Sequence, residues 1–232
     1  MKMKNNKKDI ALVLSSGGLA GVISAGFVAT ICRELGMEHF STVYCYSVGV
    51  YAGTFGVANQ PDVIEKVWRN KVNGEKLVNL YKMFTLGGRK ILNLSYLKKL
   101  FSEGKFKLDV AKALSSKTKL KYVLIENNTG ETKFISPKKE NIFDLMNAAC
   151  AVPVAYGPYK VGGKAYLDVT FVSGIHEGLD KIVKKHKKIV FVSNFPKDYI
   201  KYKVKIIVDL LQNTSSPFLL NFIQNLAKKN SK

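Results

Sequence analysis

The segment from Ser41 to Ala58 constrains the fold most, because it must turn a buried strand directly into a buried helix. Ser41–Cys45 is rich in β-branched and aromatic residues, as buried strands are. Val50–Ala58 holds small or apolar residues that can pack closely as a helix. The short connection Tyr46-Ser47-Val48-Gly49 therefore predicts Ser47 at a strand-to-helix corner. Helix N-termini carry unpaired N–H groups and partial positive charge, which stabilise negative charge developing nearby.

A second strand-to-helix turn, rich in glycine, lies upstream. Ile10–Leu14 predicts a buried parallel strand, and Ser15–Gly21 separates it from an apolar helix that runs to about Leu35. Glycines at such a turn let backbone N–H groups point at an anion, as in an oxyanion hole. Either turn alone is typical of a tight connection without chemistry. Two of them on successive strands, one with a serine at its apex, favour an active site.

A third element brings a carboxylate to a strand end. The turn-rich loop Ala151–Tyr159 precedes a hairpin-like stretch, Val161–Leu167, that delivers Asp168. With this element the chain resembles a patatin-like phospholipase over nearly its whole length. That family has an oxyanion loop of form GGGxRG, an elbow of form GxSxG and a dyad motif DGG or DGA. The corresponding segments, in the family's order, read Ser16-Gly17-Gly18-Leu19-Ala20-Gly21, Cys45-Tyr46-Ser47-Val48-Gly49 and Asp168-Val169-Thr170.

The resemblance implies a hydrolase that cleaves carboxylic esters of lipids, with phospholipids or lysophospholipids as substrates. In such an enzyme Ser47 attacks the ester carbonyl and Asp168 accepts its proton, without a catalytic histidine. The amides of Gly17 and Gly18 would hold the oxyanion. The chemistry requires no cofactor and no metal. The remaining motif positions, which support the site, are Ser16, Gly21, Cys45 and Gly49.

Three departures from the family pattern leave a second function open. Ala20 replaces the basic residue of the oxyanion loop, and Cys45 replaces the first elbow glycine. Val169 and Thr170 follow the aspartate where the family has glycine, and a β-branched residue adopts a positive φ only at a cost. The dyad loop is therefore expected to follow a different path. The alternative is a catalytically weak or inactive patatin-fold protein that binds an anionic membrane or a protein partner.

A histidine triad of the α/β-hydrolase type is a further alternative. That fold orders its partners Ser, Asp or Glu, then His, and Ser47, Asp168 and either His176 or His186 fit the order. His186 lies in a lysine-rich stretch and is predicted at a solvated helix end, whereas His176 follows the Asp168 loop. His39 is predicted in a surface turn before the elbow strand.

The order of elements predicts the α/β class, with a three-layer patatin-like fold. Strand and helix alternate along the chain, as in a mainly parallel sheet with helices on both faces. The sequence from 62 to 116 reads as helical, with Phe84–Gly88 as a candidate lid. Leu120–Glu126 and Glu131–Ile135 predict a hairpin, 141–149 a helix and 188–193 a late buried strand. An amphipathic last helix is predicted at about 217–229.

Residues 1–8 are predicted to form a basic tail, and residues 9–232 one domain. A chain of 232 residues with 47% hydrophobic content can bury one sizeable core, and no linker-like segment divides it. The uncharged run from Ile10 to Cys32 also resembles a signal peptide or membrane span, but Ser15–Gly18 divides it into strand-sized and helix-sized pieces. Three cysteines (Cys32, Cys45 and Cys150) argue against a disulfide framework and favour a reducing, cytoplasmic location.

The charge balance predicts attraction to polyanions. Lys and Arg number 37 against 17 Asp and Glu, a net charge of +20. For a lipid hydrolase such a surface would favour peripheral attachment to anionic membranes, and a plain solvated lysine surface is the equal alternative. No nucleic-acid-binding motif accompanies the charge, so specific nucleic-acid binding is not expected. The sequence does not define the oligomeric state.

Overall fold

A computed structural model describes residues 9–72, 74–78, 91–153, 155–174 and 177–194, all within the unit Met1–Asn194 of the chain. Its strands are β1 (Ile10–Leu14), β2 (Thr42–Tyr46), β3 (Lys119–Glu126), β4 (Thr132–Ile135), β5 (Tyr159–Val161), β6 (Lys164–Asp168) and β7 (Lys188–Val192). Its α-helices are α1 (Val22–Glu34), α2 (Gly49–Val57), α3 (Pro61–Asn70), α4 (Gly74–Leu77), α6 (Leu94–Ser102), α7 (Val110–Ser115), α8 (Ile142–Ala149), α9 (Val169–Val172) and α10 (Leu179–Lys185). Three 3₁₀ helices complete the set: η1 (Gly18–Gly21), η2 (Met37–His39) and η3 (Gly104–Phe106).

The described strands form one mixed sheet of seven strands in the order β5-β6-β3-β2-β1-β7, with β4 paired to β3 off this path. The pairings β7–β1, β1–β2 and β2–β3 are parallel. The pairings that β3 makes with β4 and β6, and the β5–β6 hairpin, are antiparallel. Ser47 and the glycine-rich loop thus follow parallel strands, whereas Asp168 ends an antiparallel one.

Strands β2 and β6 meet end to end along one edge of β3. Tyr122 pairs with Cys45 of β2 and with Ile135 of β4, so β2 and β4 lie on opposite edges of β3. Leu124 pairs with both β4 and Asp168, which places β6 on the same edge as β2. Because β6 runs antiparallel to β3 and β2 runs parallel to it, the C-terminal ends of β2 and β6 point toward each other.

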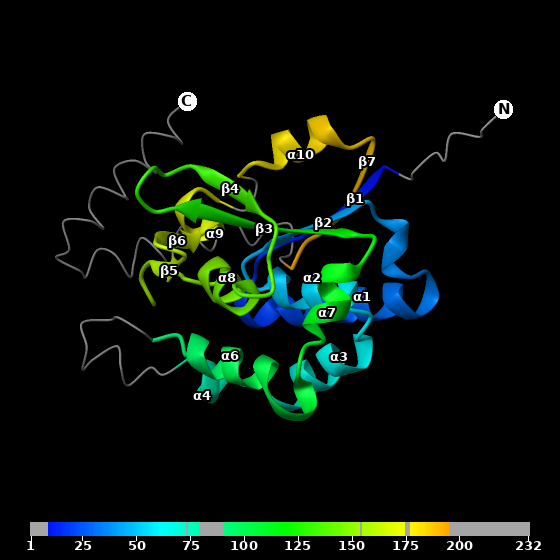
Figure 1. The fold of residues 1–232 in the computed structure, drawn as a ribbon, viewed down its shortest axis with the longest axis horizontal. Helices are drawn as coiled ribbons and strands as arrows, with labels where there is room; N and C mark the ends of the chain where they lie inside the picture. The colour runs from blue at the N-terminus through cyan, green and yellow to red at the C-terminus, as the bar shows by residue number, and fades with distance from the viewer. Residues whose placement is uncertain (1–8, 73, 79–90, 154, 175–176, 195–232) are drawn as a thin grey trace. The chain divides into compact units, whose positions relative to one another are not determined.

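Helices cover both faces of the sheet. One face packs under α1, α2 and α8, with the outer helices α3 and α6 behind them, and the other face lies under α9 and α10 (Figure 1). The strand residues alternate between the faces, as the period of a strand requires. Leu12, Leu14, Val43, Cys45 and Leu124 belong to the larger core, and Ala11, Val13, Tyr44, Tyr46 and Val123 to the smaller.

The predicted α/β class is confirmed, and most predicted elements are present. The hairpin β3–β4 and helix α8 lie where the sequence placed them, and the described parts of the region 62–116 are largely helical. The late strand β7 forms at Lys188–Val192, at the end of the described strand order, and of its residues only Val192 is buried. The lid at 84–88, the helix at 217–229 and the tail at 1–8 fall outside the described residues.

The uncharged run near the N-terminus folds as two separate elements. Ile10–Leu14 forms the buried strand β1 and Val22–Glu34 forms α1, with the glycine-rich loop between them. Among the described residues, no helix has the length and apolar character needed to cross a membrane.

Candidate active site

Ser47 occupies a strained backbone position between β2 and α2. Its φ is 47°, and Asn59 is the other non-glycine residue with positive φ in the described part of the chain. A non-glycine residue pays for this conformation, and such strain is concentrated at functional sites. The predicted corner is therefore present in the backbone, with Ser47 buried at 5% exposure. A serine in a strained turn between strand and helix is the geometry of a nucleophile elbow.

The elbow depends on close packing at the position of its second glycine. A Cβ atom at Gly49 would lie 2.7 Å from the carbonyl oxygen of Leu14 and 3.1 Å from that of Ser15. Any side chain here would push α2 away from the end of β1. Gly49 therefore fixes the helix start directly on the strand that carries the glycine-rich loop.

Cys45, which stands at the first elbow glycine, is accommodated by a glycine elsewhere. Its side chain is fully buried and points from β2 toward α2, where a Cβ atom at Gly53 would collide with its sulfur. Burial raises the pKa of the Cys45 thiol well above its usual value, so it stays protonated. The substitution thus changes the packing beneath the elbow and leaves the turn in place.

The glycine-rich loop lies beside the elbow. Gly21 is so close to Val48, the residue after Ser47, that a Cβ atom there would lie 2.7 Å from the valine side chain. Gly18 has a φ of +55° and begins η1, so its N–H has no partner within that helix. Gly17 is half-buried and Gly18 is exposed. The two predicted oxyanion donors therefore lie on the loop that contacts the elbow.

Ser16 and Ala20, two other residues of this loop, differ in their hydrogen bonding. The hydroxyl of Ser16 is buried and has no hydrogen-bond partner among the described residues. Ala20, which stands where the family has a basic residue, donates its backbone N–H to the carbonyl of Gly17 at 3.0 Å. This bond closes the turn without a contribution from the missing cationic side chain.

Asp168 is fully buried at the end of β6 and also caps the short helix α9. Its Oδ1 accepts the backbone N–H of Thr170 at 2.9 Å. Val169 begins α9 and is not among the residues with positive φ. The expected strain at Val169 is therefore absent, because the loop enters a helical turn, which suits a β-branched residue better than a left-handed one.

The sheet register brings Ser47 and Asp168 together. Tyr46, just before the elbow, pairs with Val123, and Asp168 pairs with the next residue of the same strand edge, Leu124. The backbone N–H of Asp168 also donates to the carbonyl of Ala151 at 3.0 Å, in the loop after α8. The two predicted dyad residues therefore emerge from strand ends that face each other.

Cys150 is a buried residue near the predicted dyad, and it is not among the site residues that the sequence predicts. It directly follows α8 and precedes Ala151, whose carbonyl accepts the backbone N–H of Asp168. Burial, and secondarily the negative charge of Asp168, raise the pKa of the Cys150 thiol. Its only sequence signal is its position directly before the turn-rich loop Ala151–Tyr159.

The histidines take no part in this arrangement where they are described. His186 ends α10, as predicted, but its side chain is only 5% exposed, so the prediction of a solvated group is wrong. It contacts Asp9 Oδ1 at 2.9 Å and the Tyr44 hydroxyl at 3.0 Å. These partners lie before β1 and on the α10 side of β2, away from the elbow. His39 is partly buried in η2, and His176 lies outside the described residues.

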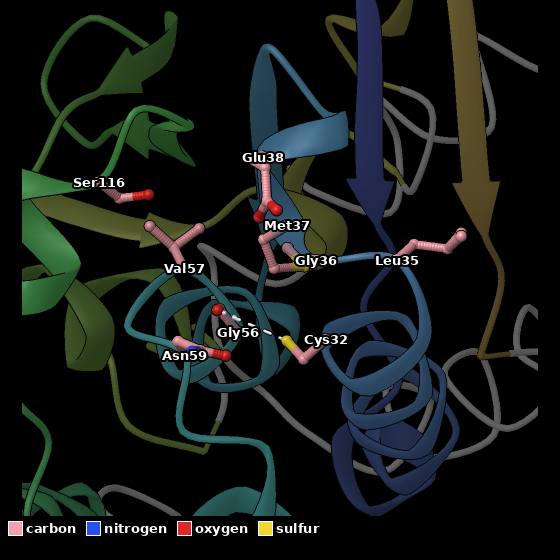
Figure 2. Close-up of a pocket in the computed structure, with 9 residues that line it drawn as sticks. All are labelled: Cys32, Leu35, Gly36, Met37, Glu38, Gly56, Val57, Asn59 and Ser116. Atoms are coloured by element: carbon pink, nitrogen blue, oxygen red, sulfur yellow. Dashed lines mark hydrogen bonds between the residues drawn. The ribbon is translucent and has the colours of Figure 1, made fainter.

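A pocket of about 390 Å³ lies at the opposite end of α2 from Ser47. Figure 2 shows it, with the sulfur of Cys32 directed at the carbonyl of Gly56, 3.5 Å away. The residues that line it are Cys32, Leu35, Gly36, Met37, Glu38, Gly56, Val57, Asn59 and Ser116. Helix α2 spans nine residues, or about 13 Å, so this pocket is separate from the elbow.

A family model for patatin-like phospholipases matches residues 12–175 of this chain. Among solved structures, the chain is similar to the crystal structure of VipD from Legionella pneumophila, with a TM-score of 0.52 and 14% sequence identity. The match covers 88% of this chain and 54% of VipD, so the chain spans about half the length of that protein. No curated protein matches the sequence significantly.

Proposed function

This chain belongs to the patatin-like phospholipase family, and from that premise we propose that it is a serine acyl hydrolase using a Ser47–Asp168 dyad. The family generally acts as lipid acyl hydrolases, and membership supports a function of the lipid-hydrolase type. The proposed substrates are the carboxylic esters of phospholipids or lysophospholipids. The observation that carries the proposal is the head-to-head arrangement of β2 and β6 on one edge of β3.

The proposed reaction begins with attack by the Ser47 hydroxyl on the ester carbonyl. The Ser47 oxygen forms a bond to the carbonyl carbon, its proton passes to Asp168, and the carbonyl oxygen becomes an oxyanion. Oδ1 of Asp168 is already held by the N–H of Thr170, which fixes the orientation of the carboxylate. When the tetrahedral intermediate collapses, the alcohol leaves with the proton from Asp168. Water then releases the fatty acid from Ser47 by the same steps.

The backbone amides of Gly17 and Gly18 are the proposed donors to the oxyanion. They belong to the loop that contacts Val48 next to the nucleophile, and donors placed before the reaction stabilise developing charge without reorganisation. Ala20 lacks the cationic side chain of the family pattern, but main-chain donors do not depend on that side chain. This favours turnover over the alternative of an inactive binding protein.

A lipid substrate is also supported by the surface beside the loop. Leu19, Val22 and Ile23 are each 50% exposed, immediately after the proposed oxyanion donors. Exposed apolar side chains clustered in sequence suit contact with acyl chains or a bilayer. With a net charge of +20, the protein is further proposed to bind anionic membranes peripherally from the cytoplasm.

Labelling with a fluorophosphonate probe tests this function. We expect the wild-type protein to be labelled and to hydrolyse phospholipid esters. Ser47→Ala should lose both properties, and Asp168→Asn should lose ester turnover. Ser136→Ala and Asp109→Asn are the matched controls, because these side chains bond elsewhere in the fold. A well-folded wild type that resists labelling but pellets with anionic liposomes would instead establish the binding protein.

A further inference from the structure

Asn194 is a buried polar residue that no motif includes. It follows β7 by two residues, and its side chain is 2% exposed. Its Oδ1 accepts two hydrogen bonds from Ser24, from the backbone N–H at 3.0 Å and from the hydroxyl at 2.8 Å. Its Nδ2 donates to the carbonyl of Ser15 at 2.9 Å. The described hydrogen bonds of the Asn194 side chain therefore all go to Ser15 and Ser24, at the two ends of the glycine-rich loop.

These bonds hold the glycine-rich loop at both ends. Ser15 begins the loop, and Ser24 lies in the first turn of α1 just beyond it. The N-cap position of α1, Gly21, makes no side-chain capping bond. Asn194 satisfies one of the first N–H groups of this helix instead, as a capping side chain would, although it is 170 residues away in sequence.

The position requires an acceptor on one side and a donor on the other. A backbone N–H can only donate and a carbonyl oxygen can only accept, so the orientation of the Asn194 amide is fixed by Ser24 and Ser15. The loop also closes directly on this side chain. A Cβ atom at Gly17 would lie 2.7 Å from the Cβ of Asn194, so Gly17 is the residue that permits the approach.

We propose that Asn194 is the positioning residue of the oxyanion loop, setting where the amides of Gly17 and Gly18 point. The effect of Asn194 on catalysis rests on the proposed function, whereas its hydrogen bonds to the residues at the ends of the loop do not. Misplacing a catalytic group by about 1 Å costs about 10²-fold in rate, so loss of this anchor should lower kcat by about that factor. KM should change little, because the amides act on the oxyanion and not on the bound ester.

The sharpest variant is Asn194→Asp, which keeps the size and the acceptor. An ionised carboxylate cannot donate to the Ser15 carbonyl, but its protonated form can. The ratio of variant kcat to wild-type kcat should therefore rise as pH falls, and using a ratio cancels the titration of the dyad itself. Ser15, Ser24 and Gly17, the residues described against this side chain, do not titrate in that range.

The control is Thr118→Val. Thr118 is equally buried at 2% exposure and donates to the carbonyl of Met37 at 2.8 Å, away from the elbow. It should lose comparable stability and keep the kcat of the wild type. Hydrogen–deuterium exchange of residues 15–21 supplies a readout independent of activity. Exchange should increase in Asn194→Ala and stay at the wild-type level in Thr118→Val.

The outcomes separate the two proposals. If the wild type does not hydrolyse esters, the proposed function fails, and the exchange measurement still decides whether Asn194 holds the loop. If Asn194→Asp keeps wild-type kcat at every pH and residues 15–21 exchange as in the wild type, Asn194 is not the positioning residue. A loss of kcat in Thr118→Val as large as that in Asn194→Asp would equally overturn the inference.

Discussion

Gly53 on α2 leaves the space that the sulfur of Cys45 fills beneath the elbow. Replacing Gly53 by Ala should therefore destabilise the protein by about 1–3 kcal/mol, as overpacking does in a core. Removing the sulfur with Cys45→Ala should relieve the strain, giving a coupling of about 1 kcal/mol in a double-mutant cycle followed by urea unfolding.

Gly26→Ala on the exposed side of α1 is the control for that cycle. A Cβ atom there meets nothing within 4 Å, so the substitution should stabilise the helix by up to about 1 kcal/mol. Equal effects at Gly53 and Gly26 would show that the Cys45 contact is not the cause.

The strain at Ser47 predicts a measurable difference between two inactive variants. Ser47→Gly and Ser47→Ala both lack the hydroxyl, but only glycine adopts a φ of 47° freely. Ser47→Gly should therefore be more stable than Ser47→Ala by about 1 kcal/mol in urea unfolding. The same pair at Asn59, with a φ of 54°, should show a similar difference while ester hydrolysis is retained. Identical stabilities of the two Ser47 variants would argue against a strained elbow.

His186 is expected to act in stability and not in catalysis. His186→Ala removes the hydrogen-bond partner of the buried Tyr44 hydroxyl and should destabilise the protein by about 1–3 kcal/mol. The kcat of the folded variant, measured well below its unfolding temperature, should equal that of the wild type. A collapse of kcat in folded protein would revive the histidine triad.

The Asp9 carboxyl should contribute stability that depends on pH. Its hydrogen bond to His186 holds the pKa of Asp9 below its usual value of 3.8. The contribution is therefore fully present above that value and is lost as pH falls through the lower pKa of the folded state. Asp9→Asn should flatten the dependence of the urea midpoint on pH between about pH 5 and about pH 2. An unchanged slope in that range would assign the effect to other carboxyl groups.

The apolar residues beside the oxyanion loop should matter for membranes and not for chemistry. Leu19→Ser combined with Ile23→Ser should lower turnover on phospholipid vesicles about tenfold, because roughly 1.4 kcal/mol of apolar burial is worth that factor. Turnover of a soluble short-chain ester should be unchanged. Leu114→Ser with Val183→Ser, which removes exposed apolar groups elsewhere, is the matched control. Equal losses on both substrates would place Leu19 and Ile23 in folding instead.

Local sequence patterns predict the positions of Ser47 and Asp168, because each lies at the end of a strand with a recognisable pattern. A β-branched strand followed by a small apolar helix predicts the corner at Ser47, and a hairpin with Gly162 and Gly163 at its turn predicts Asp168 at a strand end. Cys150 and Asn194 were not predicted because their roles come from contacts between distant segments. Their own neighbourhoods carry no period or motif.

Two expectations failed or changed for a similar reason. His186 is surrounded by lysines in sequence, but Asp9 just before β1 and Tyr44 on β2 contact its ring in the fold. Val169 looked unable to replace glycine, yet α9 begins at that residue and supplies a helical conformation. In both positions tertiary structure determined the environment, and local composition did not.

Strand β1 has β7 as its neighbour on one side, with Ile10 opposite Lys188. During synthesis, one edge of this strand stays unpaired from the time residues 10–14 emerge until residues 188–192 have left the ribosome. During that interval the nascent chain carries an open, apolar strand edge, which exposes it to aggregation or chaperone capture.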